Sequence, residues 1–153
     1  MSDEISGRLL DSVREHEGFR TTPYKDTVGV LTVGYGTNLE TIDVSRGLAT
    51  QWLVDELIGL RSKLERHPWF ANLSEVRKDA ILEMAYQLGY VGVLKFHKMI
   101  AALEDGNFWA AASEGMDSRW AREQTPTRAM VIMDRIRSGK WNPPAESRVM
   151  DDV

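Results

Sequence analysis

The feature that most constrains the fold is a change of pattern between residues 19 and 37. Before it, residues 4–16 place apolar side chains at helical spacing, and Gly18 is suited to end a helix. Within it, Thr, Tyr, Val and Leu alternate with turn-forming residues, and LTVGYG has the alternation of a strand. We therefore expect a first helix followed by a small antiparallel sheet.

The remainder of the chain has the spacing of helices. Residues 45–66 carry a stripe of large apolar side chains, and we expect Pro68 to end this long helix because it restricts the residue before it. The stripe consists of Leu48, Trp52, Leu53, Leu57, Leu60 and Leu64. The sequence predicts an α+β protein that is mainly helical, in which this helix connects the sheet to a helical lobe.

Further helices are expected between recognisable start and stop signals. Ser74 is a candidate N-cap, and the helix after it should end at Gly89. Another helix is expected over residues 93–104, and a shorter one from Phe108 to Ala112. The pair Thr125-Pro126 then predicts a last helix that ends at Gly139.

Composition excludes several classes of function. Of the 153 residues, 42% are apolar and 27% charged, which is typical of an ordered globular protein. The chain has no cysteine, so thiol nucleophiles, disulfides and Cys-ligated metals are excluded. Its three histidines lack metal-ligand spacing, and we expect neither a metal nor another cofactor.

Charge and hydropathy limit the classes of partner that the protein can be expected to bind. The net charge of −4 does not favour nucleic-acid binding. No stretch approaches the roughly 18 apolar residues of a membrane span, and no signal peptide is apparent, so stable membrane insertion is not expected. Residues 119–140 hold six positive side chains and two acids. This basic segment is either a solvated helix face or a surface for an anionic polymer, and whether it engages an outer membrane stays open.

Three residues could carry chemistry together. Glu17 ends the first helix, Asp26 follows in the turn-rich stretch, and Thr32 lies on the expected strand. Hydrolysis of a glycosidic bond needs a carboxylic acid to protonate the leaving oxygen and a second carboxylate to activate water or stabilise the positive sugar. A hydroxyl can orient that water. Spacing alone does not establish an enzyme, because the chain has 23 acids.

The segment EHEGFRTTPYKDTVGVLTVGYGT resembles the signature of the phage lysozyme family, the endolysins of tailed phages. The family triad is Glu, eight residues, Asp (sometimes Cys), five residues and Thr, and Glu17, Asp26 and Thr32 have this spacing. The resemblance continues in VRKDAILEMAYQLGYVGVLKF, SRWAREQTPTRA and SGKW, and is weakest over residues 41–72.

This resemblance implies a single two-lobed, lysozyme-like domain over residues 1–153. The N-terminal lobe would span about 15–65, and the C-terminal lobe about 66–153 together with the first helix. The small sheet would lie in the N-terminal lobe, and a cleft between lobes is the default place for a ligand.

The resemblance also implies residue roles. Glu17 would be the general acid, Asp26 the second carboxylate and Thr32 a holder of the attacking water, as in inverting enzymes. Arg128 matches a family arginine that pairs with the catalytic glutamate, and Gln87 matches a cleft glutamine near it. Burial of Glu17 and a nearby cation would act on its protonation in opposite directions.

Two further residues, Tyr86 and Asn38, match positions where the family contacts substrate. One departure concerns Thr37, which stands where the family commonly has histidine after G-x-G. An ion pair built on that histidine is therefore absent, which affects a structural contact more than catalysis. The acidic net charge also differs from the strongly basic character of some members.

The implied function is that of an endolysin, an N-acetylmuramidase that hydrolyses the β-1,4 bond between N-acetylmuramic acid and N-acetylglucosamine in bacterial peptidoglycan. A lytic transglycosylase, which cleaves the same bond without water, and a wall-binding protein without activity are the alternatives. The intact triad argues against both. We expect a monomer that is made in the host cytoplasm and reaches the periplasmic wall through a holin pore.

Overall fold

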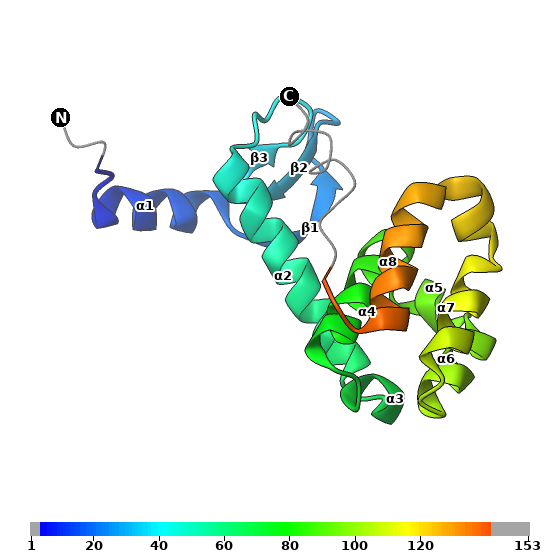
Figure 1. The fold of residues 1–153 in the computed structure, drawn as a ribbon. Helices are drawn as coiled ribbons and strands as arrows, with labels where there is room; N and C mark the ends of the chain where they lie inside the picture. Colours follow the sequence, from blue (N-terminus) through cyan, green and yellow to red (C-terminus); the bar gives the residue numbers. More distant parts are fainter. Residues whose placement is uncertain (1–3, 142–153) are drawn as a thin grey trace, which may run out of the picture. The chain divides into compact units, whose positions relative to one another are not determined.

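The computed structural model describes residues 4–141. It has the mainly helical α+β composition expected from the sequence, with one small sheet near the N-terminus (Figure 1). The chain divides into two compact units, of which the first ends at Ala49 and the second begins at Thr50. The lobe boundary near residue 65 and the assignment of the first helix to the C-terminal lobe stay predictions. Within the described residues, no helix combines the length and apolarity needed to cross a bilayer.

The first unit begins with helix α1, Gly7–Glu17. The Ser6 side chain caps it by accepting a hydrogen bond from the Leu9 amide at 3.2 Å. Gly18, with φ of 69°, ends it by taking a backbone conformation that side-chain-bearing residues rarely adopt. The stop signal at Gly18 is confirmed, and it fixes Glu17 as the last residue of the helix.

The sheet of the first unit consists of β1 (Arg20–Lys25), β2 (Leu31–Gly34) and β3 (Thr37–Asn38). The strands are antiparallel and lie in the order β1-β2-β3, as Figure 1 shows. Thr32 on the central strand lies opposite Tyr24 on β1 and opposite Asn38 on β3. The expected antiparallel sheet is therefore confirmed.

Helix α2, Arg46–Leu64, is the expected long helix, but its end differs from the prediction. It ends before Pro68, and that proline instead opens the short helix α3, Pro68–Ala71, at the position where its missing N–H costs nothing. Of the predicted apolar stripe, only Leu60 and Leu64 are buried. Helical spacing thus predicted the helix correctly, but it did not predict how many of the apolar side chains are buried.

The second unit continues with six helical segments. Helices α4 (Glu75–Leu88) and α8 (Pro126–Ser138) begin and end at the predicted signals. The helix expected over 93–104 is instead two, α5 (Tyr90–Leu94) and α6 (His97–Glu104). Helix α7 spans Phe108–Met116, and a short π-helix, Trp120–Gln124, precedes α8.

The core of the second unit lies around α4 and α8. Helix α8 packs against α4 and α7, and α7 packs against α6. Ala80, Ile81 and Met84 of α4 are fully buried, and their helical spacing places them on one face of the helix. Among residues 4–141, the largest fully buried side chains all belong to this unit: Phe70, Leu64, Ile81, Met84, Met99, Ile132, Met133, Ile136 and Val93.

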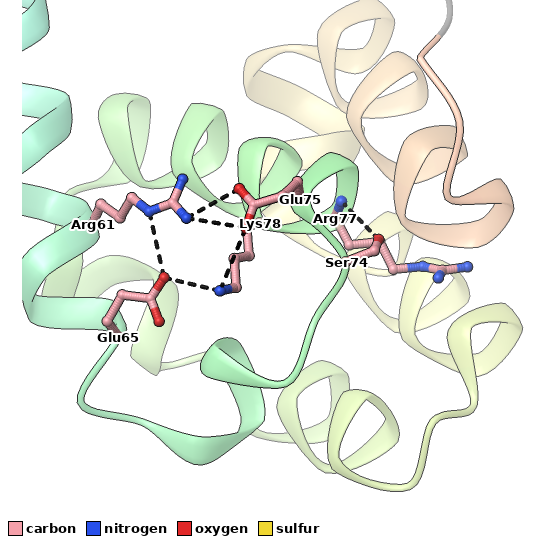
Figure 2. Close-up of polar contacts among 6 residues, drawn as sticks. All are labelled: Arg61, Glu65, Ser74, Glu75, Arg77 and Lys78. Atoms are coloured by element: carbon pink, nitrogen blue, oxygen red, sulfur yellow. Dashed lines mark hydrogen bonds and ion pairs between the residues drawn. The ribbon is translucent and has the colours of Figure 1, made fainter.

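A network of ion pairs joins the end of α2 to the start of α4 (Figure 2). Lys78, only 8% exposed, lies 3.0 Å from Glu65 and 3.8 Å from Glu75. Arg61 pairs with the same two carboxylates, and its hydrogen bond to Glu75 raises the pKa of the guanidinium. The two helices are thus held together by alternating charges.

Arg77, which directly precedes Lys78 on α4, contacts the end of α8. Its Nε donates to the Ile136 carbonyl at 2.7 Å and its Nη2 to the Arg137 carbonyl at 3.3 Å. Its guanidinium also stacks on the Phe108 ring, 3.5 Å from the centroid. Burial lowers the pKa of this guanidinium. Arg77 therefore supplies donors to carbonyls that a helix end leaves without intrahelical partners.

Candidate active site

The carboxylate of Glu17 lies beside the turn between β2 and β3. A Cβ atom added to Gly36 would be 3.1 Å from Glu17 Oε2, which is closer than ordinary contact. Gly36 has φ of 86°, a conformation that favours glycine. The turn therefore brings backbone, rather than a side chain, against the carboxylate of the predicted general acid.

Asp26 follows β1 and is held by the loop that leads into β2. Its Oδ1 accepts hydrogen bonds from the amides of Val28 and Val30, both at 2.9 Å. The Asp26 amide in turn donates to the Val30 carbonyl at 2.9 Å. These bonds fix the carboxylate relative to the hairpin, and among the described residues none donates to Oδ2.

Thr32 lies on the central strand and is 4% exposed. Its Oγ1 donates to the Val30 carbonyl at 3.0 Å, so the hydroxyl proton is engaged while the oxygen can still accept a hydrogen bond. The backbone of Val30 therefore connects the two predicted site residues, since it donates to Asp26 and accepts from Thr32.

Asn38 lies across the sheet from Thr32. Its Oδ1 accepts from the Glu40 amide at 2.9 Å, which orients the side chain and turns the chain after β3. Thr37, at the position of the family histidine, pairs with Val33 in the sheet. A β-forming residue suits that position, so its substitution for histidine is compatible with the strand.

The second unit holds the other predicted residues. Gln87, near the end of α4, accepts a hydrogen bond from Trp120 Nε1 at 3.0 Å and donates to Thr125 Oγ1 at 3.2 Å. Thr125 is the N-cap residue of α8, but its side chain makes no capping hydrogen bond and contacts Gln87 instead. Gln87 thereby ties α4 to the residue that precedes α8.

Arg128 lies in the first turn of α8 and contacts Glu83 of α4. Its Nε donates to Glu83 Oε1 at 3.2 Å. Both residues line a cavity of about 570 Å³, together with Tyr86, whose side chain remains 40% exposed. Arg128 and Glu17 belong to different units, and their pairing stays a prediction.

A family model, Phage lysozyme, matches residues 14–135 of this chain. The match covers most of the sequence and includes all seven predicted site residues, from Glu17 to Arg128. The chain belongs to the phage lysozyme family. It is therefore a lysozyme-type peptidoglycan hydrolase and a glycoside hydrolase.

Three relatives show how far the similarity extends. Probable T4-type lysozyme 1 of Dictyostelium discoideum is 29% identical over 166 residues, covering 88% of this chain and 96% of the relative. Probable T4-type lysozyme 2 of the same organism is 27% identical, covering 86% and 94%. The pre-baseplate central spike protein Gp5 of Enterobacteria phage T4 is 26% identical over 90% of this chain, but over only 29% of its own length.

The glycine in the LTVGYG segment indicated a close approach of the backbone at Gly36, and the structure shows that approach against the Glu17 carboxylate. Two residues that contact the predicted site residues were missed from sequence. Val30 acts through its backbone, which leaves no signal in its side chain. Glu83 could be placed only by knowing that α4 packs against α8. Among residues 4–141, no group of three or more acidic or histidine side chains has a metal-site arrangement.

Proposed function

We propose that this phage lysozyme family member is an N-acetylmuramidase. It hydrolyses the β-1,4 bond between N-acetylmuramic acid and N-acetylglucosamine in peptidoglycan. The observation that carries the proposal is the arrangement within the first unit, where Val30 links Asp26 to Thr32 and Glu17 packs against the hairpin turn.

Each of the three residues has one step in the reaction. Glu17 donates its proton to the glycosidic oxygen as the bond from that oxygen to the anomeric carbon breaks. A water attacks the anomeric carbon, and Asp26 accepts the proton that this water loses. Thr32 accepts a hydrogen bond from the water and so orients it, a role that suits a hydroxyl whose own proton is already donated to Val30.

This sequence of steps inverts the anomeric configuration, because water arrives opposite the leaving oxygen. An Asp26 carboxylate held by two amides stays in place while it receives the proton. NMR of the first sugar released distinguishes the outcomes directly. An α-anomer supports the inverting mechanism, whereas a β-anomer would require Asp26 to act as nucleophile.

A lytic transglycosylase is the main alternative, because it breaks the same bond. It needs no water, and therefore no residues to activate or orient one. Mass spectrometry of fragments from purified peptidoglycan separates the two reactions. Products that contain an added water support the muramidase, and anhydro ends would overturn it.

Four residues complete the proposed substrate site. Arg128 pairs with Glu17 and stabilises the carboxylate that forms once Glu17 has given up its proton, and Gln87 supports Arg128 through its bond to Thr125 at the start of α8. Tyr86 and Asn38 contact the glycan strand, for which an exposed phenol and an amide group are suited. Substitution of these two residues should raise KM more than it lowers kcat.

The biological role that we propose is lysis of the host at the end of infection. The enzyme acts as a monomer, accumulates in the host cytoplasm and reaches the wall through a holin. Expression in a bacterial host with and without a holin tests this directly. Lysis only when the holin is present supports the proposal, and rapid lysis without it would contradict the dependence.

A further inference from the structure

Glu83 divides its carboxylate between two arginines of α8. Its Oε1 accepts from Arg128 Nε at 3.2 Å, and its Oε2 accepts from Arg135 Nη1 at 2.7 Å. The two arginines lie seven residues apart, which is close to two helical turns, and so they share one face of α8. One acid on α4 thus connects two successive positions on the neighbouring helix.

The contact with Arg135 anchors this carboxylate. The Arg135 side chain is 4% exposed, and its guanidinium lies over the Trp141 ring at 4.2 Å from the centroid. A buried cation attracts a carboxylate more strongly than an exposed one, because solvent screens it less. Glu83 Oε2 is therefore held by a fixed partner, which leaves Oε1 to act on Arg128.

The position of Arg128 at the start of α8 explains why it needs a carboxylate partner that is held in place. It occupies the third position of α8, near the positive end of the helix dipole, where a cation is unfavourable. Its side chain is 41% exposed, so several rotamers are open to it without a partner. A carboxylate at its Nε offsets the dipole and selects one direction for the guanidinium.

Other charged groups around the pair are few. The cavity next to Arg128 is lined by Arg61 and Asp79 as its remaining charged residues, and by apolar side chains such as Leu57. Arg61 is already engaged by Glu65 and Glu75. Glu83 is thus the carboxylate in contact with Arg128 among the described residues.

We propose that Glu83 is a positioning residue that sets the direction of the Arg128 guanidinium for catalysis. This inference rests on the proposed function, in which Arg128 supports the general acid. It assigns a role to a residue that does not itself contact substrate. Activity should therefore depend on Glu83 only as long as Arg128 is present.

A double-mutant cycle tests this dependence. We expect Glu83→Gln to lower kcat/KM on purified peptidoglycan by about tenfold, because it removes a positioning contact. In an Arg128→Ala background the same change should have no further effect. Independent, multiplying effects of the two substitutions would overturn the proposal, as would wild-type activity in either single variant.

Two additional variants keep the test interpretable. Glu123→Gln removes the exposed partner of Arg119, at 2.9 Å, and should leave kcat/KM unchanged. Glu83→Asp keeps a negative charge for buried Arg135 while it shortens the reach to Arg128, and it replaces Glu83→Gln in the cycle if that variant does not fold. Activity in Glu83→Asp equal to wild type would then overturn the proposal.

A measurement without substrate separates this inference from the proposed function. The Nε–H proton of Arg128, followed by ¹⁵N NMR, should exchange with water faster in Glu83→Gln than in wild type, while that of Arg119 stays unchanged. Unchanged exchange at Arg128 would contradict the positioning contact. A wild-type protein that shows the contact but does not cleave peptidoglycan would overturn both the proposed function and the catalytic purpose of Glu83.

Discussion

Replacing Gly36 with alanine should impair catalysis by displacing the Glu17 carboxylate. The added Cβ would lie 3.1 Å from Glu17 Oε2, so the carboxylate must move by a few tenths of an ångström to reach ordinary contact. Since a misplacement of about 1 Å can cost roughly 100-fold in rate, we expect kcat/KM to fall by about 3- to 10-fold.

The same substitution also strains the backbone. Alanine at φ of 86° costs about 1–2 kcal/mol, which should lower Tm by roughly 2–8 °C in a chain of this size. Gly34→Ala is the matched control, because Gly34 also has positive φ, of 68°, but no atom within 4 Å of its added Cβ. It should show comparable strain without the loss of activity.

Both variants can be assayed by release of reducing ends from purified peptidoglycan, alongside thermal unfolding followed by circular dichroism. The contact with Glu17 accounts for the result only if the two variants differ in activity. An equal loss of activity in both would refute the reasoning, because backbone strain alone would then explain it.

Three further predictions concern stability and the attacking water. Thr32→Val should fold but lower kcat by about 10-fold or more, since the buried hydroxyl is lost while the shape is kept; retained kcat would exclude a role in orienting water. Arg77→Ala should lower the free energy of unfolding by about 2–3 kcal/mol in urea titrations, because α8 loses two hydrogen bonds and the stack on Phe108. Lys78→Met should change it by less than about 1 kcal/mol, since the partner carboxylates keep Arg61 and are partly exposed; a loss above about 3 kcal/mol would show that the buried charge is essential.

Local signals in the sequence predicted much of the fold. Caps and glycine stops identified the ends of α1, α4 and α8, because these signals act within one or two turns. Such signals gave a wrong prediction where the same residues are compatible with two different structures. Pro68 opens α3 rather than directly ending α2, and a single apolar run over residues 93–104 concealed the break between α5 and α6.

The sequence predicted the three motif residues of the candidate site, but not the contacts that hold them or their neighbours. The spacing of Glu17, Asp26 and Thr32 follows from the family motif, and all three lie in one unit. Backbone contacts such as those of Val30 depend on the detailed turn geometry, which spacing does not determine. Contacts between helices, such as that of Glu83, depend on which faces pack together, and that information is spread over the whole core.

The central claim, that Glu17 is the general acid, is tested most directly by comparing two glutamine variants of the same helix. Glu17→Gln removes the proton that the mechanism requires, whereas Glu15→Gln changes an exposed acid two residues earlier on α1. The rate of reducing-end release from peptidoglycan should fall by at least about 100-fold in Glu17→Gln and stay at the wild-type level in Glu15→Gln. A Glu17→Gln protein that folds and cleaves at the wild-type rate would contradict the account.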